Sequence, residues 1–290
     1  MYPSAFDYQA PSTLEEALAA LAEVGDEGRV LAGGQSLIPM MKLRLATPGV
    51  LVDINGIPGL NFIEGTNGHL RVGALVRHND IVESDVVTRM NHTMAAAAPW
   101  ISDPLVRNRG TVCGSVAHCD PEGDWNSVMM ALRARVVARS SSGERVIPID
   151  DFVVDFFTNS LQPGEMVTEV RIPQYTGAAG GSYLKLERKV GDYATAAVAT
   201  HLQLDAAGKV AQAGIALTAV NSINTRAAAS EAVLVGETPS AELFNEAAEL
   251  AAQASDPEDN IRGPAEYKRD VIRVYTRRGL AQALELAQAS

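Results

Sequence analysis

The hydrophobic positions near the start of the chain predict a small unit in which helices and strands alternate. Apolar residues recur at helical spacing from 14 to 21, behind two overlapping capping boxes that pair Ser12 with Glu15 and Thr13 with Glu16. The predicted elements that follow are a helix end at Gly25, a strand at 28–31, a turn at 32–36, a helix at 37–45 and a strand at 50–54. This order is a strand, a turn, a helix and a second strand.

The middle of the chain shows a mixed pattern of short strands and helices. Strand-like runs lie at 70–73 and 166–172, and a hairpin is predicted from 135–138 and 144–147 across a Ser-rich turn. Helical patterns cover 94–100 and 125–133, with a glycine-interrupted segment at 111–117.

A Gly- and Ala-rich stretch at 174–181 favours a domain boundary near residue 177. Three longer strands are predicted beyond it, at 182–189, 194–205 and 209–220, and three helices then follow near 226–233, 240–254 and 265–288. Strands followed by helices in one block indicate an α+β unit, with an antiparallel sheet covered by helices.

Length and composition fit a folded protein of about two domains. The chain has 290 residues, of which 47% are hydrophobic, and its net charge is −11. An acidic protein of this kind does not suit a nucleic-acid backbone, which requires a basic face. No apolar run approaches the roughly 20 residues of a membrane span, and the first residues lack a signal-peptide pattern. We therefore expect a soluble, cytoplasmic protein.

The two cysteines exclude two kinds of site within the chain. Cys113 and Cys119 can form neither a disulfide framework nor, unaided, a four-cysteine zinc or iron–sulfur site. Any iron–sulfur cluster that exchanges electrons with this protein is expected on another chain.

The turn at 32–36, Ala-Gly-Gly-Gln-Ser, is the first candidate for binding chemistry. Its two glycines let backbone N–H groups point at an anion, and the Ser36 hydroxyl and the following helix N-terminus add to the attraction. The turn matches neither a Gly-x-Gly-x-x-Gly fingerprint nor a Walker loop. A diphosphate cradle is one interpretation, and an ordinary tight turn whose serine caps the helix is the other.

The segment at 103–117 is the second candidate. Its glycines and small residues allow a ligand to approach the backbone, and Thr111 and Ser115 supply hydroxyls. Arg107 and Arg109 are cations in an acidic protein, and a surface ion pair is their alternative role.

Three further features have mainly structural interpretations. The His, Cys and Asp residues at 118–124 lack the partners for a metal site, and Asp124 is expected to cap the helix that begins at Trp125. Cys113 is expected to be a small packed residue rather than a reactive thiol. Alternation places Tyr183 and Lys185 on one strand face, which could be a solvated edge.

Taken together, three of these segments resemble the FAD-binding medium subunits of molybdenum hydroxylases, the family of aerobic carbon monoxide dehydrogenase and xanthine dehydrogenase. Residues 32–46, AGGQSLIPMMKLRLA, are similar to the first flavin loop of that family, and residues 103–115, DPLVRNRGTVCGS, to the second. Residues 185–193, KLERKVGDY, match the start of its C-terminal domain. The medium subunit of aerobic carbon monoxide dehydrogenase and its relatives have the closest pattern, and the resemblance covers the whole chain in order.

The resemblance implies an α+β fold in two parts. A two-part FAD-binding domain of the vanillyl-alcohol-oxidase (PCMH) type would occupy 1–177, with subdomains at about 1–56 and 57–177. A C-terminal domain of the family's type, an antiparallel sheet with helices, would occupy 178–290.

The resemblance also implies which residues bind the cofactor. The two glycine-containing loops, Ala32 to Ser36 and Thr111 to Ser115, would hold the FAD diphosphate. Asp124 would hydrogen-bond toward the ribityl or ribose hydroxyls, Ile101 and the Met166–Val167 strand would line the adenine side, Lys185 would reach the polar edge of the flavin ring, and Tyr193 would lie against the ring. The expected cofactor contacts are Ala32, Gly33, Gly34, Gln35, Ser36, Leu37, Ile101, Gly110, Thr111, Gly114, Ser115, Asp124, Val167, Lys185 and Tyr193. No catalytic residue and no metal ligand is expected in this chain.

The partners follow from the same resemblance. A large subunit would oxidise the substrate at a molybdopterin cofactor, and a small subunit would carry two [2Fe–2S] clusters. This chain would take electrons from the clusters into FAD and pass them to a quinone, NAD or another acceptor. Any association with the inner face of the membrane would come through the complex, and carbon monoxide, a purine or an N-heteroaromatic compound would each suit it as substrate.

Two alternatives and one departure from the family pattern stay open. The chain could be a stand-alone FAD-dependent oxidoreductase of the same fold, or a scaffold whose glycine loops are only structural. Cys113 stands where most of the family has glycine, and a left-handed backbone at that position would force the second loop to adjust.

Overall fold

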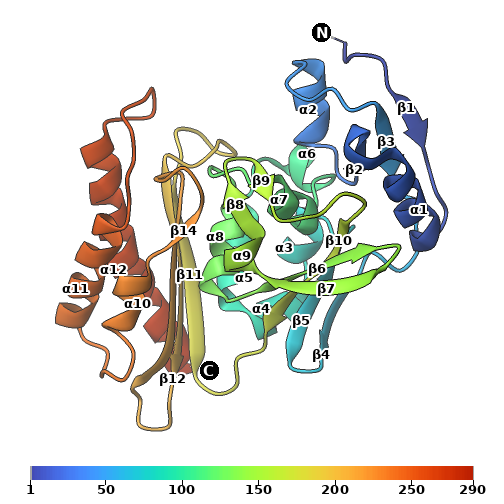
Figure 1. Cartoon of the computed structure of the whole chain (residues 1–290). Helices are drawn as coiled ribbons and strands as arrows, with labels where there is room; N and C mark the ends of the chain where they lie inside the picture. Colours follow the sequence, from blue (N-terminus) through green and yellow to red (C-terminus); the bar gives the residue numbers. More distant parts are fainter. Residues whose placement is uncertain (1, 290) are drawn as a thin grey trace.

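The computed structural model describes residues 2–289, and its N-terminal unit is a small parallel sheet (Figure 1). The strands are β1 (Asp7–Gln9), β2 (Gly28–Leu31) and β3 (Val50–Asp53), in the order β1-β3-β2. Helix α1 (Leu14–Val24) and the short η1 (Gly25–Glu27) precede β2, and α2 (Leu37–Lys42) connects β2 to β3. The predicted strand–turn–helix–strand order is confirmed, although α2 ends three residues earlier than expected.

One of the two predicted capping boxes of α1 is present. Thr13 is the N-cap residue. Its hydroxyl accepts a hydrogen bond from the backbone N–H of Glu16, and the Glu16 carboxylate accepts one from the backbone N–H of Thr13. Ser12 donates to the same Glu16 carboxylate rather than to Glu15, so the predicted box between Ser12 and Glu15 is wrong. The reason is that the Glu16 carboxylate accepts from both Ser12 donors as well as from the Thr13 N–H.

A five-stranded antiparallel sheet follows, in the order β4-β5-β10-β6-β7. Its strands are β4 (Ile63–Thr66), β5 (His69–Gly73), β6 (Arg135–Ser140), β7 (Gly143–Pro148) and β10 (Met166–Pro173), which confirms the predicted hairpin and strands. The small hairpin of β8 (Val153–Asp155) and β9 (Thr158–Asn159) precedes β10. The helices of this part are α3 (His78–Val82), α4 (Asp85–Met90), α5 (His92–Ala97), η2 (Ala98–Trp100), α6 (Pro104–Arg107), α7 (Val112–His118), α8 (Asp124–Ala131) and α9 (Ile149–Phe152).

One expectation for this part is corrected, and one segment that the sequence left without an element is assigned. The glycine-interrupted segment at 111–117 forms helix α7, with Thr111 as its N-cap. Asp124 does not cap α8, because Gly123 occupies the N-cap position and Asp124 is already the first helical residue. Its carboxylate is therefore available for other contacts.

The C-terminal part is an antiparallel sheet backed by two long helices. Its strands are β11 (Ala179–Leu186), β12 (Ala196–Leu204), β13 (Val210–Thr218) and β14 (Thr225–Arg226), in sequential order. The helices are α10 (Ala228–Ala232), α11 (Ala241–Gln253) and α12 (Ala265–Ala289). The strand predicted at 182–189 ends at Leu186, and the chain then forms a loop that contains Tyr193. The division into domains at 1–177 and 178–290 stays a prediction.

This sheet is buried on both faces. Val198 and Leu202 of β12 pack with α11 and α12, while Ala197 and Ala199, on the opposite face, join the core that contains α5 and α8 (Figure 1). Small residues on that opposite face, such as Ala197, Ala199 and Gly214, let α8 approach closely: a Cβ at Gly214 would lie 1.9 Å from the carbonyl oxygen of Ala131. All eight residues of α8 are buried. Among the described residues, no helix is both long and apolar enough to cross a bilayer.

Candidate cofactor-binding site

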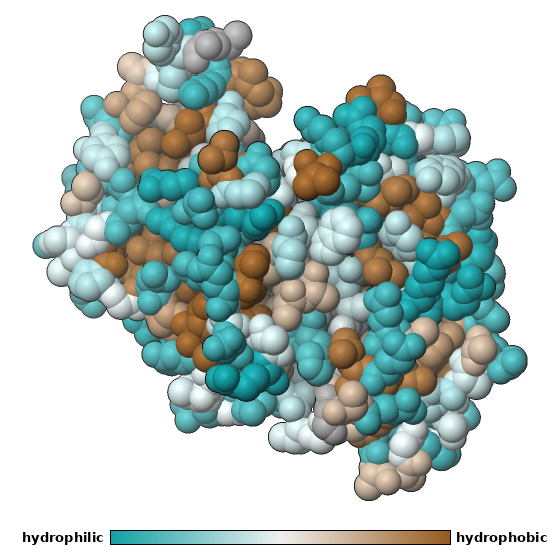
Figure 2. Space-filling view, turned by 180° about the vertical axis from the view of Figure 1, so that it is seen from behind, coloured by the Kyte–Doolittle hydropathy of each residue, from teal (hydrophilic) through white to brown (hydrophobic). Residues whose placement is uncertain are grey.

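A cavity of about 1350 Å³ lies where the three sheets meet. Its wall includes the turn before α2, the segment that leads into α7, the start of α8, β10 and the loop after β11. The molecular surface is hollowed at its upper edge between the N-terminal and C-terminal parts (Figure 2). The volume exceeds the roughly 300–1,000 Å³ of most small-molecule pockets, so an extended dinucleotide can be accommodated.

All fifteen residues that the sequence predicted for cofactor binding line this one cavity. They come from both halves of the chain and are Ala32, Gly33, Gly34, Gln35, Ser36, Leu37, Ile101, Gly110, Thr111, Gly114, Ser115, Asp124, Val167, Lys185 and Tyr193. Met166 lies beside Val167 in the same wall.

The two glycine-containing loops pack directly against each other. A Cβ at Gly33 would lie 2.4 Å from the carbonyl oxygen of Arg109 and 2.7 Å from the Cα atom of Gly110. Since both of these are backbone atoms, neither can move aside without shifting its loop. Glycine at position 33 is therefore required by the contact between the loops.

The first loop offers a row of free backbone donors. The N–H groups of residues 33–37 donate to no acceptor within the described range 2–289. Ser36 stands at the N-cap position of α2, but its hydroxyl makes no capping hydrogen bond, so the alternative of a serine-capped turn is wrong. Successive free N–H groups in a turn form a concave site suited to an anion, and this donor set fits a diphosphate.

Arg77 and Asn55 connect the two loops from behind. The Asn55 amide donates to the carbonyl oxygen of Ala32 at 2.8 Å, and its own oxygen accepts from the Arg77 guanidinium at 2.6 Å. Arg77 also donates to the carbonyl oxygen of Arg109 at 2.5 Å. Burial, with the nearby Arg109 charge, lowers the pKa of Arg77. This chain of hydrogen bonds fixes the spacing between the two loops.

Arg107 holds the wall near Ile101 rather than making a surface ion pair. Its guanidinium donates to the carbonyl oxygens of Pro99, Ile101 and Ser102 at 3.2, 3.1 and 2.8 Å. Neither Arg107 nor Arg109 forms an ion pair with another described residue. The surface-pair alternative is therefore wrong.

Asp124 and Lys185 form a buried ion pair that joins α8 to β11. The Lys185 ammonium lies 3.0 Å from the Asp124 carboxylate and 3.0 Å from the carbonyl oxygen of Trp100, and the Tyr183 hydroxyl donates to Asp124 at 2.5 Å. The side chain of Lys185 is 1% exposed, so a solvated strand edge is excluded. Burial raises the pKa of Asp124, against the opposing effect of Lys185, and raises that of Tyr183.

Tyr193 covers one side of the cavity and is supported from behind. Its side chain is 48% exposed, and the Arg262 guanidinium lies 6.0 Å from its ring centroid. Arg262 is held in turn by an ion pair with Glu122. The loop before α12 thus supports the residue that was expected to contact the flavin ring.

Cys113 departs from the family pattern without distorting the loop. It lies in the first turn of α7 and is not among the residues with positive φ. Its thiol is buried, 3.5 Å from the carbonyl oxygen of Val72, and burial raises the pKa of the thiol. The position therefore does not need glycine, and Cys113 is the packed residue that was expected.

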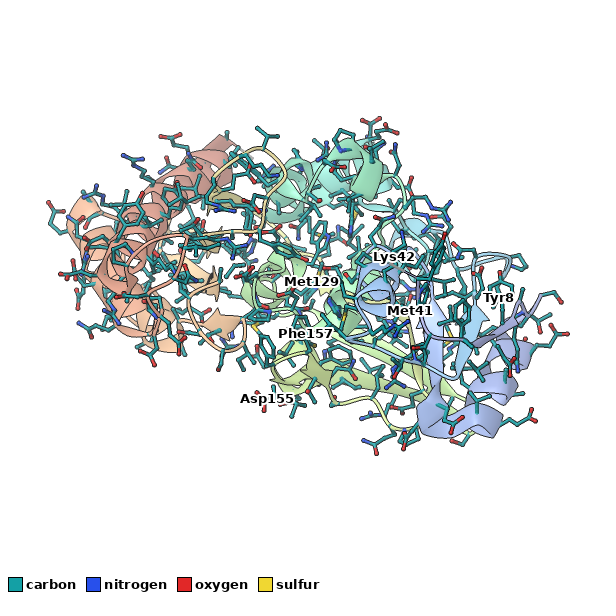
Figure 3. The ribbon with its side chains drawn as sticks, turned by 90° about the horizontal axis from the view of Figure 1, so that it is seen from above. Tyr8, Met41, Lys42, Met129, Asp155 and Phe157 are labelled. Carbon is teal, nitrogen blue, oxygen red and sulfur yellow. The ribbon has the colours of Figure 1, made fainter. Side chains whose placement is uncertain are left out.

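Sequence reasoning missed several residues in the cavity wall. His78, Phe157 and Leu161 also line the cavity. Figure 3 shows Phe157 near the middle of the molecule, whereas Tyr8 lies toward the N-terminal edge. The signal for His78 was a lone histidine at the end of the apolar run 72–76. Within residues 2–289, no cluster of three or more His, Cys, Asp or Glu side chains could hold a metal ion.

Comparison with known proteins agrees with this geometry. The sequence matches the FAD binding domain in molybdopterin dehydrogenase over residues 4–175 and the CO dehydrogenase flavoprotein C-terminal domain over residues 181–283. It is 38% identical over 288 residues to the 6-hydroxypseudooxynicotine dehydrogenase complex subunit alpha of Paenarthrobacter nicotinovorans, covering 99% of this chain and 97% of that protein. It is 36% identical over 283 residues to the carbon monoxide dehydrogenase medium chain of Hydrogenophaga pseudoflava, covering 98% of each.

A solved structure shows the same fold. Carbon monoxide dehydrogenase from Hydrogenophaga pseudoflava, in a form that lacks the Mo-pyranopterin moiety of the molybdenum cofactor, contains a chain that superposes with a TM-score of 0.94 at 38% identity. The superposition covers 98% of this chain and 99% of that one. The predicted fold class is thereby confirmed.

These matches define the class of protein: an oxidoreductase subunit that carries an FAD-binding domain and comes from a molybdenum hydroxylase. Within that class, the chain belongs to the family of medium, FAD-containing subunits of the carbon monoxide dehydrogenase type.

Proposed function

We propose that the cavity binds one FAD and that the chain transfers electrons between the [2Fe–2S] clusters of a small partner subunit and an external acceptor. The observation that carries this proposal is that fifteen residues, expected from the family resemblance and far apart in the sequence, line a single cavity. When bound, FAD would supply the redox chemistry, namely the exchange of single electrons with the clusters and the transfer of electrons to a quinone, NAD or another acceptor.

The residues of the chain would bind and orient the cofactor. The free N–H groups of residues 33–37 would hold the diphosphate, with the Thr111 to Ser115 segment on its other side. Asp124 and Lys185 would face the ribityl chain and the polar edge of the ring, and the ammonium of Lys185 would stabilise negative charge there. Tyr193 would lie against the ring, with Ile101 and Val167 on the adenine side.

The partners would be the large molybdopterin-binding subunit, where the substrate is oxidised, and the small iron–sulfur subunit. The chain has two cysteines, Cys113 and Cys119, whereas one [2Fe–2S] cluster takes four, so the clusters would be held by another chain. The matched subunit from Paenarthrobacter nicotinovorans is likewise named as part of a complex.

The test is the absorption spectrum and metal content of a tagged form of the chain purified gently from its own host. We expect flavin bands together with iron, molybdenum and two co-purifying chains. Flavin alone, without metals or partners, would favour a stand-alone FAD-dependent oxidoreductase of the same fold. A complex that never contains flavin would instead favour a scaffold.

A further inference from the structure

His78 is a cavity-lining residue that neither the sequence motifs nor the family resemblance assigns to the cofactor. It is the first residue of α3, and its side chain is 5% exposed. Its backbone N–H donates to the carbonyl oxygen of Gly110 at 3.0 Å, and a Cβ at Gly110 would lie 2.6 Å from His78 Nε2. The imidazole therefore lies directly against the residue that precedes the second glycine-containing loop.

The hydrogen bond to Trp125 assigns the tautomer of His78. The indole Nε1–H of Trp125 donates to His78 Nδ1 at 3.0 Å. Because an indole nitrogen can only donate, Nδ1 must be an acceptor, and the single proton of a neutral imidazole is then on Nε2. Burial, with Arg107 and Arg77 nearby, lowers the pKa of His78 to about 3, so the ring is neutral at physiological pH.

The Nε2–H group is left without an acceptor in the protein. No described residue accepts a hydrogen bond from it, while the side chain borders the cavity. The Nε2 atom is not one of the fully buried polar atoms without a partner, so this donor reaches the surface of the cavity. A ligand that fills the cavity can therefore supply the acceptor for this donor.

We propose that His78 is a further cofactor-binding residue, whose neutral Nε2–H donates a hydrogen bond to a diphosphate oxygen of FAD. The contact with Gly110 places this donor beside the Thr111 to Ser115 segment, and Gly110 is also in contact with Gly33 of the first loop. The inference rests on the proposed binding of FAD. It adds a side-chain donor to a site in which the backbone supplies most of the contacts.

Two substitutions separate the donor from the shape of the side chain. In His78→Asn, the amide oxygen can still accept from Trp125, but the side chain is too short to place a donor at the Nε2 position. In His78→Gln, the longer amide can place an N–H there. Both variants are assembled into the complex, its FAD is removed, and rebinding of FAD and of ADP is measured by titration.

We expect His78→Asn to weaken both FAD and ADP by about tenfold to a hundredfold, as for loss of a hydrogen bond to a charged group. His78→Gln should recover binding to within about threefold of the wild type, a small fraction of that loss. Thermal unfolding of both variants is measured alongside, so that a loss of FAD affinity caused by a loss of folding is recognised.

Three results would overturn the role of His78: unchanged FAD affinity in His78→Asn, equal losses in the two variants, or a loss for FAD without a loss for ADP. Each of these requires that the wild-type complex binds FAD. A wild-type complex that binds no flavin would instead overturn the proposed function.

Discussion

At the scale of single residues, the contact between the two glycine-containing loops makes the sharpest prediction. Gly33→Ala would place a methyl group 2.4 Å from the carbonyl oxygen of Arg109, so the loops would have to separate. Overpacking of this kind costs about 1–3 kcal/mol, and we expect a loss of FAD affinity of at least about tenfold. The measurement is FAD content and affinity of the assembled complex.

Gly56→Ala is the matched control for this variant. A Cβ at Gly56 meets only the carbonyl oxygen of Pro11, at 4.0 Å, and the position has no positive φ. The control should bind FAD like the wild type. Equal FAD affinity in the two alanine variants would show that the spacing of the loops does not matter for binding.

The buried pair of Lys185 and Asp124 gives a second prediction at this scale. Lys185→Met leaves the Asp124 carboxylate buried without its cation, which costs about 3–5 kcal/mol of folding free energy. We also expect a lower flavin reduction potential, because a positive charge near the ring favours its reduced, anionic form. Chemical unfolding and potentiometry of the complex measure the two effects separately.

The double variant Lys185→Met with Asp124→Asn distinguishes the two effects. Removing both charges should restore part of the folding stability, because the carboxylate is no longer left uncompensated. The flavin potential should stay below that of the wild type. A single Lys185→Met variant with unchanged FAD affinity and potential would count against any role of Lys185 toward the flavin.

Short motifs made two stretches of the cavity wall predictable, residue by residue, and the family resemblance added the other expected residues. The segments at 32–36 and 110–115 contain their own signal, because glycines just before a helix allow close backbone contacts. His78, Asn55 and Arg77 were not predicted, since their roles depend on partners more than twenty positions away. A sequence pattern does not contain that spatial information.

At the scale of elements, the close packing of α8 on the C-terminal sheet determines the shape of the site. Gly214→Ala would place a methyl group 1.9 Å from the carbonyl oxygen of Ala131 and push β13 away from α8. We expect a loss of about 1–3 kcal/mol in folding free energy, as for overpacking in a core, and weaker FAD binding because Asp124 and Lys185 separate. Chemical unfolding and FAD titration measure these effects.

The same denaturant midpoint for Gly214→Ala and the wild type would contradict the importance of this close packing. Gly56→Ala again serves as the control for replacing glycine by alanine without a contact. A variant that loses stability but keeps its FAD affinity would show that the packing of α8 and the geometry of the site are independent.

Element types were more predictable than element ends. The strands from 196 to 218 are long and apolar, and a linker precedes the sheet, so their existence followed from the pattern. The end of β11 did not, because Lys185 and Glu187 alternate as in a strand, although the chain turns away after Leu186. Helix α7 was missed because Gly114 lowers helix propensity, which tertiary contacts here outweigh.

At the scale of the whole molecule, buried histidines predict sensitivity to acid. Burial lowers the pKa of His201 in β12 to about 3, against 6.5 for an ordinary histidine, and its ring lies 3.9 Å from that of Tyr175. Between these two values the unfolded chain binds a proton that the folded chain does not. The contribution of His201 to the free energy of unfolding is therefore fully present above about pH 6.5, and it falls by about 1.4 kcal/mol per pH unit below that value.

His201→Phe tests this prediction. The variant should lose about 2 kcal/mol less stability than the wild type between pH 7.5 and pH 5, because it has no proton to gain on unfolding. Chemical unfolding at the two pH values gives the difference directly. An identical pH dependence in the wild type and the variant would mean that folding does not lower the pKa of His201.

In the whole molecule, the C-terminal sheet closes a cavity that is otherwise formed by the N-terminal parallel sheet, the five-stranded sheet and their loops. One face of the C-terminal sheet packs on α5 and α8, and its strand β11 contributes Lys185 to a cavity whose loops come from the N-terminal half. The most direct test of this account is a density map of the purified complex with its flavin. We predict the FAD diphosphate between residues 32–36 and 111–115, with the ring against Tyr193. A map that shows flavin bound elsewhere, with this cavity empty, would contradict the account.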